Sequence, residues 1–172
     1  STHFSNPSSS PISFENEDGK LRRSYGRHSS AHESFLSDLY VEYSMRTKSF
    51  KLFLNVVGGM GLGLIDDIEF AKYNVPYSNL RVRPGGEPSK TEVDREFIVP
   101  KFYVNRLVLS PSQFSEGTLK TLAQVFYIVR NRNELLLIEE PEIGVHYGLL
   151  KGILELITQV TDTKQIILST HS

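Results

Sequence analysis

The sequence has no cysteine among its 172 residues. A disulfide framework and a thiolate metal site are therefore both excluded, and a reducing, cytoplasmic location is expected. Charge of one sign is not in excess either. The sequence has 19 Lys and Arg residues and 20 Asp and Glu residues, which gives a net charge of −1. This balance argues against a general binder of nucleic acids or anionic membranes. No apolar run reaches the roughly 20 residues that cross a bilayer, and no signal peptide is visible.

The remaining composition suits one ordinary hydrophobic core, since 39% of the residues are apolar. Residues 1–33 are rich in serine and bury little apolar surface, which predicts a polar linker or loop. A basic cluster at 20–28 ("KLRRSYGRH") is either a solvated segment or a contact for nucleic acid.

Residues 34–109 predict a helical part followed by an insertion. Apolar residues recur at helical spacing from Phe35 to Val57, and Gly58 follows as a natural helix end. A short β element is expected at 62–70 and an irregular or hairpin insertion at 75–94. Residues 97–109 predict a strand that is interrupted at Pro100.

Residues 110–172 alternate between helix and strand. Ser115 is a candidate N-cap for a helix with an apolar stripe at Leu119, Leu122, Ala123 and Phe126. The apolar run 134–138 predicts a strand covered on both faces, a helix follows to about residue 160, and 165–169 predict a second buried strand. This order predicts parallel neighbours joined by a helical crossover, within an α/β fold.

Carboxylates follow the first of these two strands. Glu139 and Glu140 end it, and His171 follows the second strand. Because parallel strands end at one edge of a sheet, the three residues are expected in a single crevice. An apolar strand that ends in acidic residues is typical of a Mg-nucleotide site, where one carboxylate serves the metal and the next activates water.

Three stretches together resemble the ABC-type ATPases of the RecF, SMC and OLD-like group, in particular the AAA-type ATP-binding proteins of bacterial defence systems. "LLLIEEPEIGVH" is similar to the Walker B strand and its following turn, "IILSTHS" to the switch-histidine strand, and "SEGTLKTLA" to a variant signature motif. The resemblance implies a P-loop NTPase-like fold with a mostly parallel sheet flanked by helices. It implies ATP and Mg²⁺ as cofactors.

The resemblance also implies roles for individual residues. Glu139 would serve magnesium, although the family usually has Asp there; Glu140 would be the catalytic base and His171 the switch histidine. Ser115, Gly117 and Thr118 would contact a nucleotide held by the opposite subunit of a dimer, and Gly144 and His146 would lie in the interface loop. A nuclease or other effector partner is implied, whereas a membrane partner is not.

The phosphate-binding pattern G-x-x-x-x-G-K-[ST] does not occur in the sequence. We expect only the C-terminal half of the ATPase domain in this chain, with the phosphate loop outside it. "GGMGLG" at 58–63 predicts a helix cap and turn instead. Two alternatives stay open: a metal-dependent nuclease or phosphodiesterase that uses Glu139, Glu140 and His171, and a non-hydrolysing scaffold subunit.

Overall fold

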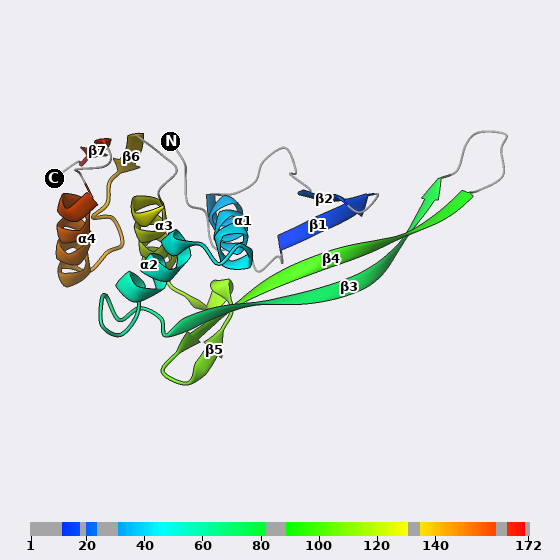
Figure 1. Cartoon of the computed structure of the whole chain (residues 1–172), viewed down its shortest axis with the longest axis horizontal. Coiled ribbons are helices and arrows are strands. Elements are labelled where there is room, and N and C mark those ends of the chain that lie inside the picture. The colour runs from blue at the N-terminus through cyan, green and yellow to red at the C-terminus, as the bar shows by residue number, and fades with distance from the viewer. Residues whose placement is uncertain are drawn as a thin grey trace.

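The computed structural model describes residues 12–17, 20–23, 31–81, 89–130, 135–160 and 165–170. Figure 1 shows a helical body with a small sheet at one end and a long ribbon that projects from it. None of the helices in these ranges is long and apolar enough to cross a membrane.

The helical part predicted for this region is confirmed, and it consists of two helices, α1 (Ala31–Ser44) and α2 (Lys48–Val57). A short turn separates them. Thr47 caps the start of α2, since its hydroxyl accepts a hydrogen bond from the Phe50 amide at 3.1 Å. Gly58 ends α2 and its amide donates to the Leu54 carbonyl at 2.9 Å, so the predicted stop at this glycine is confirmed.

The larger sheet is antiparallel, so the predicted mostly parallel sheet is not confirmed. It has five strands in the order β2-β1-β4-β3, and β5 pairs with β4. The strands are β1 (Ile12–Glu17), β2 (Lys20–Arg23), β3 (Asp67–Arg81), β4 (Ser89–Val104) and β5 (Leu107–Leu109). β1 and β2 lie in the segment predicted to be a polar linker, so that prediction is wrong at 12–17 and 20–23. Successive strands joined by short connections pair antiparallel, which explains the β1–β2, β3–β4 and β4–β5 pairs.

β3 and β4 form the projecting ribbon, with pairing from Asp67 opposite Tyr103 to Arg81 opposite Ser89. The hairpin alternative for 75–94 is therefore correct. The predicted interruption at Pro100 is wrong, since Pro100 pairs with Phe70 inside β4. On the other edge of β4, the described partners end at Ile98 and resume at Phe102, so Pro100 lies where a missing N–H is tolerated.

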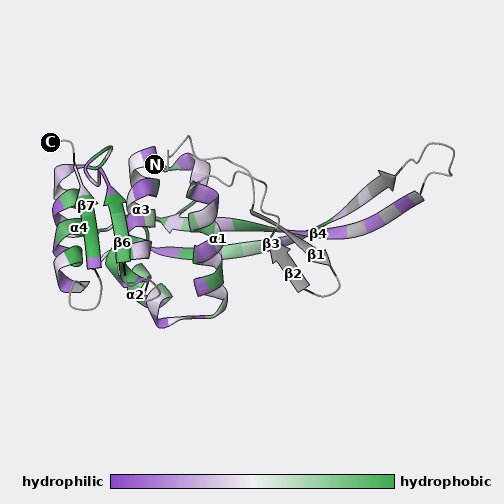
Figure 2. Ribbon diagram, turned by 90° about the horizontal axis from the view of Figure 1, so that it is seen from above, coloured by the Kyte–Doolittle hydropathy of each residue, from purple (hydrophilic) through white to green (hydrophobic). Residues whose placement is uncertain are grey.

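The predicted crossover is confirmed: β6 (Leu135–Glu139) and β7 (Gln165–Ser169) are parallel neighbours, joined through α4 (Tyr147–Val160). Cover on both faces is not observed among the described residues. Leu137 is 65% exposed and Ile167 49%, whereas Ile138 on the opposite face is 6% exposed. Figure 2 shows both strands as largely hydrophobic segments that lie on one side of the helices.

The helix α3 (Glu116–Val129) occupies the centre of the body, next to α1, α2, α4 and β6. Apolar side chains along it, among them Leu119, Leu122, Val125 and Ile128, are fully buried. Phe126 meets Phe35 of α1 and Phe53 of α2 edge to face, each at 5.6 Å between ring centroids. Aromatic pairs of this geometry add to the free energy of burial, so α3 holds the neighbouring elements in place.

A charged cluster anchors the C-terminal end of α3 to α1. Arg130, which follows the helix, lies 2.7 Å from an oxygen of Asp38 and 3.1 Å from one of Glu42. Glu42 also accepts from the Thr47 hydroxyl at 2.6 Å, which ties in the cap of α2. Burial lowers the pKa of Arg130, but the hydrogen bond and charge of Asp38, with those of Glu42, outweigh it and raise the pKa above its usual value.

The Arg130→Met substitution tests this anchor. Glu42 is only 1% exposed, so removal of the guanidinium leaves a buried carboxylate without its cation. We expect the free energy of unfolding to fall by about 3–5 kcal/mol. Arg46 is exposed in the turn between α1 and α2, and Arg46→Met is the matched control that should change stability by less than about 0.5 kcal/mol. Equal effects of the two variants in chemical denaturation would contradict the anchoring role.

Candidate functional site

The strand β6 ends in a strained turn that begins at Glu140. The Glu140 amide donates to the Ser169 carbonyl of β7 at 2.8 Å, which extends the parallel ladder by one residue. Its φ is +48°, in the left-handed region that is costly for residues with a side chain. The turn then closes through the Ile143 amide, which donates to the Glu140 carbonyl at 3.1 Å. Glu139 is exposed and Glu140 is half-buried.

The N-terminus of α3 has the cap that the sequence predicts. The Ser115 hydroxyl accepts from the Thr118 amide at 3.1 Å and lies 2.8 Å from the Thr118 hydroxyl. Ser115 is exposed and Thr118 is half-buried. The helix dipole and the remaining free amides of the first turn favour an anion at this end.

The start of α3 is in direct contact with the turn after β6. A Cβ atom added to Gly117 would lie 1.8 Å from the Gly144 carbonyl oxygen, so only glycine fits there without a backbone shift. Lys120, one turn further along α3, donates its ammonium to the Glu140 carbonyl at 2.7 Å. The structure therefore brings the signature-like residues Ser115, Gly117 and Thr118 next to the carboxylate turn of the same chain.

The two residues expected in the interface loop have structural roles. Gly144 has φ of +71°, which glycine adopts at little cost, and it is exposed. The His146 Nδ1 atom accepts from the Gly148 amide at 3.2 Å, in the manner of a cap for α4. Its carbonyl accepts from Leu149 and Leu150, and the side chain remains exposed.

The end of β7 is tied to the same turn. The Thr170 hydroxyl donates to a Glu142 carboxylate oxygen at 2.6 Å. His171 lies outside the described residues, so its expected place beside the carboxylates remains a prediction.

The described residues include no group of three or more His, Asp or Glu side chains that could hold a metal ion. His171, which the nuclease alternative also uses, lies outside these residues. A magnesium ion bound with a nucleotide has a smaller requirement, because phosphates and water supply most of its oxygen ligands. The exposed carboxylate of Glu139 at the sheet edge fits that requirement.

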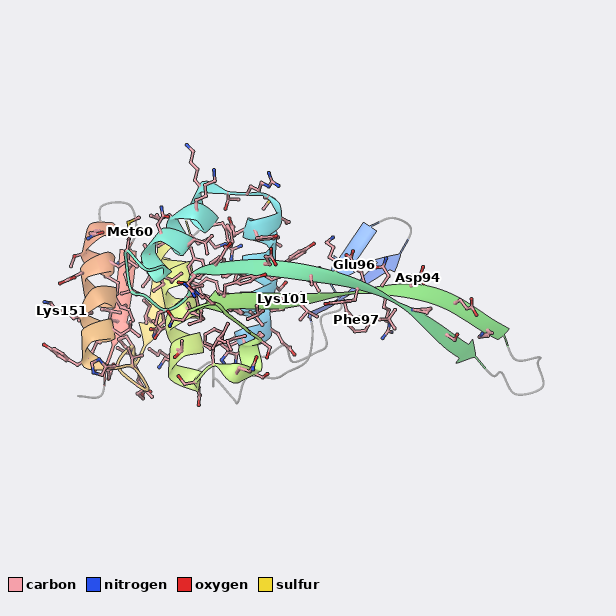
Figure 3. All side chains as sticks on the ribbon, turned by 90° about the horizontal axis from the view of Figure 1, so that it is seen from below. Met60, Asp94, Glu96, Phe97, Lys101 and Lys151 are labelled. Atoms are coloured by element: carbon pink, nitrogen blue, oxygen red, sulfur yellow. The ribbon has the colours of Figure 1, made fainter. Side chains whose placement is uncertain are left out.

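The glycine-rich loop 58–63 folds back on the end of α2, as the sequence predicts. The Leu62 amide donates to the Val56 carbonyl at 2.7 Å, and a Cβ on Gly61 would lie 2.0 Å from the same oxygen. The loop and α4 line an open groove of about 590 Å³, and Met60 and Lys151 mark its two sides in Figure 3. The contact with Val56 accounts for Gly61 without a phosphate.

Sequence reasoning missed two residues of the site, Lys120 and Thr170. Both lie inside motifs that were recognised, "SEGTLKTLA" and "IILSTHS". The side chain of a lysine on a helix, however, is usually expected to lie in solvent, so Lys120 was not singled out. The signal that could have found it is its position on the same helix face as Gly117, three residues earlier.

Comparison with known proteins finds one match in the same part of the chain. Residues 103–172 match the family model described as "AAA domain, putative AbiEii toxin, Type IV TA system". The matched segment is less than half of the chain and contains α3, β6, α4 and β7. No curated protein matches the sequence. Residues 103–172 are therefore similar to an AAA-type, P-loop ATPase-like domain, a class that binds nucleotides.

The contact between α3 and the turn can be tested with Gly117→Ala. The new methyl group meets the Gly144 carbonyl, so we expect stability to fall by about 1–3 kcal/mol. Gly59→Ala is the matched control, because nothing lies within 4 Å of a Cβ atom there. The melting temperatures of both variants, measured by thermal unfolding, are compared with that of the unmodified protein. An unchanged melting temperature for Gly117→Ala would show that the two backbones are not in contact.

Proposed function

We propose that this chain forms the C-terminal half of an ABC-type ATPase domain of the RecF, SMC and OLD-like group. The proposal is carried by one observation: the start of α3 packs on the turn that holds Glu140, through Gly117 and Gly144. Signature-like and Walker B-like residues are thereby joined within one subunit. The match of residues 103–172 to an AAA domain supports the same class. The phosphate loop, absent from these 172 residues, would come from elsewhere in the protein.

Glu139 and Glu140 take separate roles in this proposal. Glu139 ends β6 opposite Ser169, where its exposed carboxylate would serve the magnesium shell. Magnesium, when bound, neutralises charge on the nucleotide phosphates. Glu140 would orient and deprotonate the attacking water. Its left-handed backbone supports the assignment, because strained residues of this kind cluster at active sites.

The start of α3 would meet a nucleotide held by a second subunit. The Ser115 hydroxyl and the amides of the first turn are the groups available to an anion there. Gly117 needs no phosphate to explain its missing side chain, since Gly144 already fills that space. Gly144 and His146 are exposed beside this end and would face the partner subunit. The proposal therefore includes an ATP-dependent homodimer or larger oligomer.

ATP-driven dimerisation would control an effector or an activity directed at nucleic acid, in an anti-phage role. The matching family is described as a putative AbiEii toxin of a Type IV TA system. This description supports a role of the chain within a toxin–antitoxin system. A nuclease partner or fused domain is the effector of this proposal.

The Glu140→Gln substitution in the full-length protein tests the role of the base. Glutamine keeps the size of the side chain but cannot accept the proton, so ATP turnover should fall by about 100-fold or more. Binding of Mg-ATP should persist because the phosphate contacts are unchanged. Glu155→Gln, at an exposed position of α4, is the matched control and should turn over ATP normally. Near-normal turnover in Glu140→Gln would remove this residue from the mechanism.

A second substitution, Ser115→Arg, tests the contact between subunits. The bulky cation at the start of α3 should block closure of the dimer around ATP, while each subunit still binds nucleotide. On a sizing column with Mg-ATP, Glu140→Gln should elute as a dimer and Ser115→Arg as a monomer. Adding Ser115→Arg to Glu140→Gln should abolish that dimer, and a dimer that persists would contradict the role of this helix end.

A further inference from the structure

Lys120 holds the backbone of Glu140 from the side of α3. Its ammonium donates to the Glu140 carbonyl at 2.7 Å in a half-buried position. No carboxylate in the described ranges forms an ion pair with Lys120. A flexible, strongly hydrated side chain usually remains in water, so its place on a neutral carbonyl points to a defined role.

Glu140 depends on such contacts because its conformation is strained. Its amide is held by the Ser169 carbonyl, and its carbonyl is held by the Ile143 amide and by Lys120. Without the lysine, a donor that fixes the carbonyl is lost. The residue can then relax from the left-handed region, where φ is +48°, toward the extended region. A rotation of this kind would move the carboxylate away from its place.

The same contact connects Glu140 to the start of α3. Lys120 lies one turn after Gly117, whose backbone touches Gly144 on the same turn. α3 is packed into the core from Leu119 to Val129, so its exposed first turn is the start of a rigid element that transmits a shift. Any displacement when that end meets a nucleotide would reach the Glu140 carbonyl through the lysine.

We propose that Lys120 is a positioning residue that couples engagement of the α3 N-terminus to the placement of the Glu140 carboxylate. The inference rests on the proposed ATPase function. It adds a regulatory link within one subunit: the helix end that meets the partner's nucleotide also sets the base for the subunit's own nucleotide.

The experiment measures steady-state ATP turnover of the full-length protein with Lys120→Met. Methionine keeps the apolar stem but donates no hydrogen bond, so kcat should fall by up to about 100-fold while KM for Mg-ATP changes little. Lys120→Arg keeps a donor and should restore part of the rate. Lys151→Met, on an exposed lysine of α4 that lies 3.7 Å from Glu155, is the control and should leave kcat unchanged.

A double-mutant cycle separates positioning from a general loss of structure. If Lys120 acts through the Glu140 carboxylate, Lys120→Met should add almost nothing to the defect of Glu140→Gln. Independent, multiplied defects would overturn the inference, as would a normal kcat in Lys120→Met. Should Lys120→Met not fold, Lys120→Leu, which also donates no hydrogen bond, takes its place in the cycle with the same expected results. Absence of ATP hydrolysis by the unmodified protein, or normal turnover of Glu140→Gln, would instead overturn the proposed function and this inference with it.

Discussion

The close approach of Gly117 to Gly144 is the constraint on which the site depends. The helix start and the strand-to-helix turn can meet this closely only because residue 117 carries no side chain, and the φ of +71° at Gly144 favours glycine in the turn as well. Once they meet, the signature-like residues and the carboxylates form a single unit, and Lys120 comes within reach of the Glu140 carbonyl. The contact explains Gly117 and the backbone conformation explains Gly144, both within one subunit and before any nucleotide is considered.

This constraint is effective because α3 is fixed at both ends. Its first turn rests on Gly144, and Arg130 after its last turn is held by Asp38 and Glu42 of α1. Between these ends its side chains are buried against α1, α2 and α4. Tightly packed interiors transmit strain instead of absorbing it. In the proposed mechanism, a shift of the helix start at Ser115 would therefore be transmitted to the carboxylate turn.

The sequence predicted the elements whose signals are local. The parallel strands at 135–139 and 165–169, the crossover helix and the Ser115 cap all follow from apolar periodicity and capping chemistry. β1 was missed because Ile12 and Phe14 provide only a short alternation within a serine-rich segment, and its pairing with β4 is a long-range contact. The Lys120 contact was missed for the same reason, since its acceptor lies 20 residues away on another element. The exposed face of β6 and β7 was also unexpected, because an apolar run does not reveal how many layers cover it.

The backbone at the end of β6 explains why two adjacent carboxylates are not redundant. Strand alternation places Glu139 on the same face as Leu135 and Leu137, which is the exposed face of the small sheet. Glu140 would fall on the opposite, buried face if the strand continued, where an ionised carboxylate is costly. The left-handed turn at Glu140 breaks the alternation and releases its side chain from that face. The strain at this residue, which the Lys120 and Ser169 contacts offset, therefore gives the neighbouring glutamates different surroundings. Two carboxylates in different surroundings can take different chemical roles, one toward a metal and one toward water.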